Sequence, residues 1–283
     1  MQAPKQIECY NWDMNDYIKT TLFLGLLSIF IVLLGGTLGG QDGTYLAFMF
    51  AIVMNVGGYF FSDKIALAIS GAKELTQEEN PKIHRIVEEL ALTMGLPKPR
   101  VYIIDSMQAN AFATGRNPRH AAIAVTRGIT SVLNEEELKA VLAHELGHIK
   151  NRDILISTIA AVLASTLTVM ARTQGRTDKD LGILGVVLAL FAPIGALIVQ
   201  MAISRDREFE ADETAAETLN TGRTLSTALI KIHESAHNEP LNVNPAFSNL
   251  YIANPFGVFS GMSKLFATHP PVEERIKRLT KYN

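Results

Sequence analysis

The segment HELGH at residues 144–148 constrains this chain more than any other stretch. It lies within residues 135–152, which favour a helix, so His144 and His148 stand on one helical face. Their imidazoles then point at one common position, and Glu145 lies about 100° further round the helix, near that position. Two neutral imidazoles suit Zn²⁺, and a nearby carboxylate can take a proton from a water that the ion polarises. The spacing therefore predicts a metal site on this helix.

The start of the same helix carries a second signal. Asn134 is a favourable N-cap residue, and Glu137 stands three residues later, which is the spacing of a capping box. The alternative interpretation is that two histidines fall four residues apart by chance in an ordinary helix. The helix signal and an acidic segment further along the chain favour the metal site.

A metal site of this kind needs a third protein ligand. The best candidate is Glu208, because residues 204–219 also favour a helix. Asp212 lies four residues later on the same face, where it can accept a hydrogen bond from the free ring nitrogen of a ligand histidine. The alternative is a solvated acidic helix face that pairs with Arg205 and Arg207.

Four motifs, in this order, resemble the HtpX family of membrane-bound zinc endopeptidases, which are relatives of the CAAX prenyl proteases. They are NAFATG at residues 110–115, LAHELGHIKNRD at 142–153, the acidic segment at 204–212 and THPP at 268–271. The resemblance extends from the first apolar run to Arg278. It implies a gluzincin-type protease domain with one Zn²⁺ per chain. It also implies a bacterial or archaeal cell membrane, a cytoplasmic protease domain and a role in membrane-protein quality control.

The family pattern is met without substitution at His144, Glu145, His148, Glu208 and Asp212. It implies that His144, His148 and Glu208 are the metal ligands. It further suggests that His269 points to the active site and helps to stabilise an oxyanion. The alternative for His269 is a residue that caps the last helix, whose first turn contains proline.

Composition narrows the class of protein. The chain has 283 residues, of which 48% are hydrophobic and only 19% charged. These proportions fit a chain that is partly embedded in a membrane. A net charge of −2 gives no argument for a nucleic-acid partner, so polypeptide substrates and a lipid bilayer are the expected partners. Cys9 is the single cysteine, which excludes an intrachain disulfide.

Four apolar runs approach or reach the length needed to span a bilayer, at residues 20–38, 45–61, 154–170 and 181–203. A short polar turn at residues 39–43 separates the first two, which predicts a helical hairpin. The third run is the weakest because it contains serine and threonine. For the last two runs, the alternative is a buried hairpin in a soluble core.

The predicted organisation alternates membrane and protease parts. Lysine and arginine after the second run place the protease region in the cytoplasm. Arg172, Arg176 and Lys179, between the last two runs, conflict with that orientation. The expected parts are a polar segment at 1–19, a two-span hairpin at 20–61, a first protease part at 62–153, a second two-span hairpin at 154–203 and a second protease part at 204–283.

The fold class is expected to be mainly α with a small β-sheet, joined to multi-pass membrane helices. Residues 101–104 and 121–126 favour strands. The second leads toward the histidine helix, and we expect it to be an edge strand that pairs with extended substrate by β-addition. The backbone near residues 110–113 is the other candidate, and an ordinary sheet is the alternative. The candidate substrate-binding residues are Asn110, Ala111, Ala121, Ile123 and Val125.

The sequence as a whole predicts a membrane-anchored zinc endopeptidase that acts on misfolded or damaged membrane proteins. Glu145 removes a proton from water and later delivers it to the leaving amine. The ion, together with His269 in the active-site interpretation, stabilises the negative charge of the transition state. One alternative is a catalytically silent scaffold that binds misfolded chains, against which the intact Glu145 argues. The other is a narrow-specificity processing peptidase of the prenyl-protease type, for which four apolar runs are fewer than expected.

Overall fold

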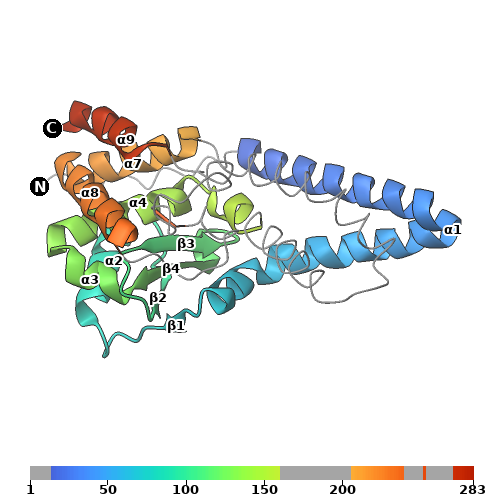
Figure 1. Ribbon diagram of the computed structural model, residues 1–283, viewed down its shortest axis with the longest axis horizontal. Helices are drawn as coiled ribbons and strands as arrows, with labels where there is room; N and C mark the ends of the chain where they lie inside the picture. Colours follow the sequence, from blue (N-terminus) through green and yellow to red (C-terminus); the bar gives the residue numbers. More distant parts are fainter. Residues whose placement is uncertain (1–13, 160–204, 239–250, 253–269) are drawn as a thin grey trace, which may run out of the picture. The chain divides into compact units, whose positions relative to one another are not determined.

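The computed structural model describes residues 14–159, 205–238, 251–252 and 270–283 (Figure 1). The chain divides into two compact units, Met1–Phe60 and Phe61–Asn283. The predicted runs at 154–170 and 181–203 lie mostly outside the described residues, and so does His269.

The described part of the first unit is helical and belongs to α1, Met14–Ile69, which reverses direction at Gly40 and continues into the second unit. Gly40 has φ 59° and ψ −141°, a backbone conformation that glycine adopts without a steric penalty. The two arms lie side by side, because the Asn55 amide donates a 2.7 Å hydrogen bond to Ser28 Oγ across 27 residues. Gly35 and Gly43 allow the backbones to meet near the bend. The reversal therefore falls inside the polar turn expected at residues 39–43, and most of that turn is helical.

The second arm carries an unusually apolar surface. Gly39–Ile69 is long and apolar enough to cross a membrane, and it is the only such helix in the described part of the chain. A soluble protein rarely exposes so large a contiguous apolar patch without a partner surface. The large apolar side chains exposed on this arm are Tyr45, Leu46, Phe48, Met49, Phe50, Ile52, Val53, Val56, Phe60, Phe61, Ile65 and Ile69.

The second unit contains a four-stranded mixed sheet with strand order β1-β2-β4-β3. The strands are β1 Lys73–Glu74, β2 Arg100–Ile104, β3 Ala111–Gly115 and β4 Ala121–Thr126. β2 and β4 are parallel, whereas β1 pairs with β2 and β3 pairs with β4 in the antiparallel sense. The predicted strands at 101–104 and 121–126 are confirmed, and β1 and β3 were not predicted.

Helices cover one face of this sheet. They are α2 Pro81–Thr93, α3 Arg127–Val132, α4 Glu135–Lys150, α7 Arg205–Leu219, α8 Arg223–Asn238 and α9 Val272–Leu279. α4 contacts β3, α2, α7 and α8, so it runs through the middle of the helical layer (Figure 1). Its first turn has the predicted capping box, in which Asn134 and Glu137 bond each other's backbone N–H.

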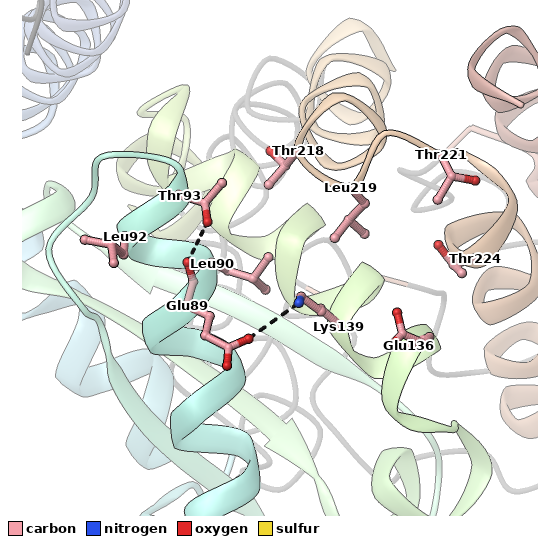
Figure 2. Close-up of a pocket in the computed structure, with 10 residues that line it drawn as sticks. All are labelled: Glu89, Leu90, Leu92, Thr93, Glu136, Lys139, Thr218, Leu219, Thr221 and Thr224. Carbon is pink, nitrogen blue, oxygen red and sulfur yellow. Dashed lines mark hydrogen bonds and ion pairs between the residues drawn. The ribbon is translucent and has the colours of Figure 1, made fainter. Parts of the chain in front are cut away.

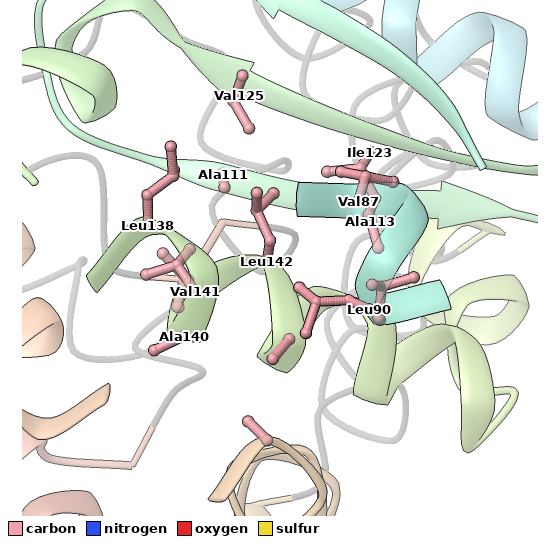
Figure 3. Close-up of a cluster of buried hydrophobic side chains, with 14 of the residues drawn as sticks. Val87, Leu90, Ala111, Ala113, Ile123, Val125, Leu138, Ala140, Val141 and Leu142 are labelled. Atoms are coloured by element: carbon pink, nitrogen blue, oxygen red, sulfur yellow. The ribbon is translucent and has the colours of Figure 1, made fainter. Parts of the chain in front are cut away.

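Strand alternation divides the apolar side chains between two clusters. Figure 3 shows the larger cluster, where side chains of α2 and α4 meet the sheet; the labelled residues are Val87, Leu90, Ala111, Ala113, Ile123, Val125, Leu138, Ala140, Val141 and Leu142. The opposite face packs Phe112, Ala122 and Ala124 against Leu67 and Tyr251. β4 is therefore buried on both faces, as expected for an internal strand.

Candidate active site

The two histidines of α4 meet the acidic face of α7. His144 Nε2 and His148 Nε2 are 3.1 Å apart. Glu208 Oε1 lies 3.6 Å from His148 Nε2, and its Oε2 lies 3.7 Å from His144 Nε2. One ligand atom from each residue lies within 4.8 Å of the others, which makes these three residues the candidate metal-ligand group of the described chain.

Each histidine has a carboxylate on its other ring nitrogen. His144 Nδ1 donates to Asp212 Oδ1 at 3.0 Å, and His148 Nδ1 donates to Asp153 Oδ2 at 2.9 Å. A proton fixed on Nδ1 leaves the lone pair of Nε2 free, and both Nε2 atoms face Glu208. The arrangement therefore presents two imidazole nitrogens and one carboxylate to a cation.

The charges around the site also favour a cation. Glu145, Glu208, Asp212 and Asp153 are all buried. Arg275 is 1% exposed and is the basic side chain that faces this group, bonding Asp212 at 2.6 and 2.8 Å and lying 3.7 Å from Glu208 Oε2. The carboxyl groups outnumber the guanidinium, and a divalent ion would offset the negative charge that they carry when ionised.

The pKa directions have clear physical causes. Burial lowers the pKa of His144, so its neutral, ligand-competent form is favoured. Burial alone would lower the pKa of His148 too, but the Asp153 carboxylate, helped by Glu208 and Glu145, raises it to about 10. Because metal binding requires the neutral imidazole, a bound ion would take the place of the second ring proton of His148.

Glu145 lies beside the ligand group and contacts the sheet. Its side chain is 1% exposed, and burial raises its pKa to about 7. The backbone N–H of Ala113 in β3 bonds its carboxylate and opposes this rise. A carboxylate with a pKa near neutrality, held at the edge of a sheet, suits a general base.

The sheet order corrects the predicted substrate strand. β4 pairs on both sides, with β2 and with β3, so Ala121, Ile123 and Val125 cannot receive another strand. Asn110 is also wrong as a backbone partner, because its C=O accepts from Thr126 N at 3.0 Å and its N–H donates to Thr126 Oγ1.

The edge strand at the site is β3, which pairs with β4 alone among the described strands. Ala111 C=O points outward, where it accepts a 3.1 Å hydrogen bond from Ile252 N. Alternate residues of a strand point the same way, so the backbone groups of Ala113 and Gly115 also point away from β4. Ile252 thus covers the start of this edge, and Ala113 lies next to Glu145.

The remaining acids of α7 lie elsewhere. Glu210 is exposed, and Glu213 accepts a hydrogen bond from the Tyr282 hydroxyl. Glu208 and Asp212 are therefore the two acids of this helix that the fold turns toward the histidines.

A separate groove of about 500 Å³ lies between α2, the first half of α4 and the junction of α7 and α8. Figure 2 shows Glu89 and Lys139 in an ion pair of 3.5 Å at this groove, together with Thr218, Leu219 and Thr224. None of the ligand candidates lines it, so this groove is distinct from the metal-ligand group.

Two residues of the site were not predicted from the sequence. Arg275 stands on the same face of α9 as Val272 and Leu279. A basic residue on an otherwise apolar helix face was the sequence signal that could have identified it as a buried, paired residue. Asp153 stands five residues after His148 and directly before an apolar run, a position typical of a helix cap.

Residues 77–283 match Peptidase family M48. A protein of Syntrophobacter fumaroxidans named Protease HtpX homolog is 46% identical over 280 residues, covering 94% of this chain and 99% of the relative. The Protease HtpX homolog of Persephonella marina is 48% identical over 276 residues, which cover 93% of this chain and 96% of the relative. The Protease HtpX homolog of Pyrococcus furiosus is 46% identical over 277 residues, which cover 94% of this chain and 95% of the relative.

Among solved structures, Ste24p of S. mikatae is similar with a TM-score of 0.52 and 20% identity. The match covers 94% of this chain and 65% of that structure, and it supports the fold. The family match and the relatives together show that the chain belongs to peptidase family M48, among its HtpX proteases, and is therefore a metallopeptidase.

Proposed function

We propose that this protein is a membrane-anchored zinc endopeptidase that cleaves misfolded or damaged membrane proteins on the cytoplasmic side. The observation that carries the proposal is the convergence of His144, His148 and Glu208 next to Glu145 and β3, the edge strand of the described sheet. Each part alone occurs in many folds, but a peptidase needs all of them at one place.

Zinc fits the three ligands better than a hard cation does. Two imidazoles and one carboxylate, with a fourth position open, are a common ligand set of zinc peptidases. Zinc bonds of about 2.0–2.2 Å in a tetrahedron separate two ligand atoms by roughly 3.3–3.6 Å. The two Nε2 atoms are 3.1 Å apart, and each lies 3.6–3.7 Å from a different oxygen of Glu208, so the separations are close to that range. Calcium and magnesium prefer six or more oxygen ligands, which this group does not offer.

Bound zinc would supply Lewis acidity to water and to the scissile carbonyl. Glu145 takes the proton from the attacking water and passes it to the leaving amine, a role that suits its buried carboxylate beside the ligands. Asp212 and Asp153 keep the two imidazoles in the tautomer that binds through Nε2. His269 is proposed to stabilise the developing negative charge.

The substrate would add as a strand to the outer edge of β3. Ala113 C=O and the backbone of Gly115 point outward there, whereas Ile252 occupies Ala111 C=O and the Glu145 carboxylate accepts from Ala113 N–H. An extended chain can therefore pair only beyond Ala111, which brings its backbone toward Glu145. Recognition through backbone groups favours unfolded segments of many sequences over one folded motif.

The membrane part of the proposal is supported by the apolar surface of α1. Residues 154–203 are proposed to form a second hairpin that returns the chain to the same side, so that the protease parts at 62–153 and 204–283 form one domain. The lysine and arginine residues around the first part support a cytoplasmic position for that domain.

The test is proteolysis by the full chain purified in detergent and supplied with zinc. Casein, an unfolded protein, should be cut, a chelator should stop the reaction, and Glu145→Gln should keep its zinc but lose about 10²–10⁴-fold of the rate. Cleavage of a prenylated peptide with casein left intact would favour the processing peptidase. Zinc-loaded protein that cuts neither would favour the silent scaffold.

A further inference from the structure

We propose that Asp153 is a positioning residue for the metal ligand His148, and that it joins this ligand to the start of the next helix. The inference rests on the proposed metal site. Asp153 Oδ2 lies 2.9 Å from His148 Nδ1, and the aspartate is 3% exposed. A short hydrogen bond that is shielded from water fixes both the tautomer and the orientation of the ring.

The backbone of Asp153 returns to the same histidine. α4 ends at Lys150, and Asn151 N donates to Gly147 O at 2.8 Å. Arg152 then adopts φ 62°, the left-handed conformation that non-glycine residues rarely occupy. This reversal lets Asp153 N donate to His148 O at 3.3 Å, so Asp153 contacts His148 through both its backbone and its side chain.

Asp153 also stands directly before the next helix, at its N-cap position. Residues 154–159 are helical, and Ser157 N donates to Asp153 O at 3.2 Å. An aspartate at this position ordinarily accepts from an amide of the first turn. Here Oδ2 bonds His148 instead, and Oδ1 is buried without a hydrogen-bond partner among the described residues. A buried carboxylate oxygen without a hydrogen bond lowers the stability of the fold. This cost argues that the contact of Asp153 with His148 is functional.

The first turn of that helix is tied to the substrate edge as well. Thr158 Oγ1 donates to Ile154 O at 2.6 Å and accepts from Thr114 Oγ1 of β3 at 2.9 Å, both groups being fully buried. Thr158 therefore gives a matched control, because it holds the same turn without touching His148.

The experiment measures zinc affinity of the full chain in detergent by competition with a chromophoric chelator. Asp153→Ser keeps a capping side chain but is too short to reach His148, so its Kd for zinc should rise about 10–100-fold. Asp153→Asn retains an acceptor without the charge, so its Kd should lie between those of Asp153→Ser and the wild type. The visible absorption of the Co²⁺-loaded protein should change in the Asp153 variants, because the ligand field at His148 changes.

Thr158→Val should lower thermal stability and leave the zinc Kd and the Co²⁺ spectrum as in the wild type. A wild-type Kd in Asp153→Ser would overturn the proposal. So would a loss of affinity in Thr158→Val that matches its loss of stability, since the role of the turn would then be structural. If Asp153→Ser does not fold, the Kd and spectrum of Asp153→Asn decide. Failure of His144→Ala to lower zinc binding would instead refute the metal site itself.

Discussion

Gly147 of α4 lies directly against the backbone of Ala211 in α7. A Cβ placed on Gly147 would stand 3.2 Å from both the Cα and the carbonyl oxygen of Ala211, closer than such contacts normally are. Gly147 precedes His148, and Ala211 precedes Asp212. The absence of a side chain at residue 147 therefore lets α7 bring its two acids within reach of the histidines.

Gly147→Ala should weaken metal binding by about tenfold, the size of effect that a displaced supporting residue produces. The added methyl group pushes α7 outward by a few tenths of an ångström and widens the ligand triangle. Alanine alone would stabilise a helix by about 1 kcal/mol relative to glycine, whereas overpacking costs about 1–3 kcal/mol. Chelator competition and thermal unfolding measure the two effects.

A second substitution sharpens the Gly147 test. Ala211→Gly should not restore zinc binding in Gly147→Ala, because the close atoms belong to the Ala211 backbone. Restoration, or a variant that is more stable with unchanged affinity, would contradict the role given to this contact.

Glu208→Ala should lose most of its zinc, whereas Glu210→Ala and Glu213→Ala should retain it. Glu208 faces both histidines at 3.6 and 3.7 Å, while Glu210 is exposed and Glu213 bonds Tyr282. Metal analysis of the three purified variants checks this. Zinc loss in either of the other two variants would mean that a different acid closes the site.

Arg275→Met should destabilise the protein by about 3–5 kcal/mol, because it leaves the Asp212 carboxylate buried without its charged partner. Burial would raise the pKa of Asp212, and the Arg275 guanidinium holds it below its ordinary value. Adding Asp212→Asn should recover part of the stability. A double-mutant cycle of thermal unfolding measures the coupling between Arg275 and Asp212. Strictly additive losses of stability in the two single variants would refute that coupling.

Glu137→Gln should lower stability by about 1 kcal/mol near neutral pH, the typical contribution of a helix cap. Burial would raise the pKa of Glu137, but hydrogen bonds from Lys231 and from Asn134 N–H outweigh it and lower the pKa. A lowered folded pKa stabilises above the ordinary glutamate pKa, and the contribution is lost as the pH falls through the folded value.

The difference in melting temperature between the wild type and Glu137→Gln should therefore shrink below about pH 4.5. Glu136→Gln, at an exposed neighbouring position outside the capping box, should track the wild type at every pH. A constant gap down to pH 3 would show that the Glu137 charge is not involved.

The proposed topology predicts which cysteines react in whole cells. In a background without Cys9, cysteines at Gln41 and Gln174 should react with an impermeant reagent, and one at Asn249 should react only after lysis. Four spans place the two turns outside and the protease domain inside. Labelling at Gln41 with protection at Gln174 would mean that the last two apolar runs do not cross.

Local periodicity alone predicted the centre of this site. A helix fixes the angle between residues four apart, so His144 and His148, and likewise Glu208 and Asp212, could be placed on shared faces before the fold was known. The capping box of α4 was equally local. The strand at Ala121–Thr126 was also found, but its unbroken apolar run, which is typical of an internal strand, was misinterpreted as an edge.

Only the tertiary structure decided which segments meet. Arg275 lies 63 residues beyond Asp212, and Ile252 lies 141 residues beyond Ala111, so no helical or strand period relates them. Strand order made β3 the edge strand of the described sheet, and close packing at Gly147 determined how near the acids of α7 come to the histidines. Such contacts follow from how whole elements fit around a shared core. Sequence periodicity governs which way a side chain points on its own element, and packing governs what it meets there.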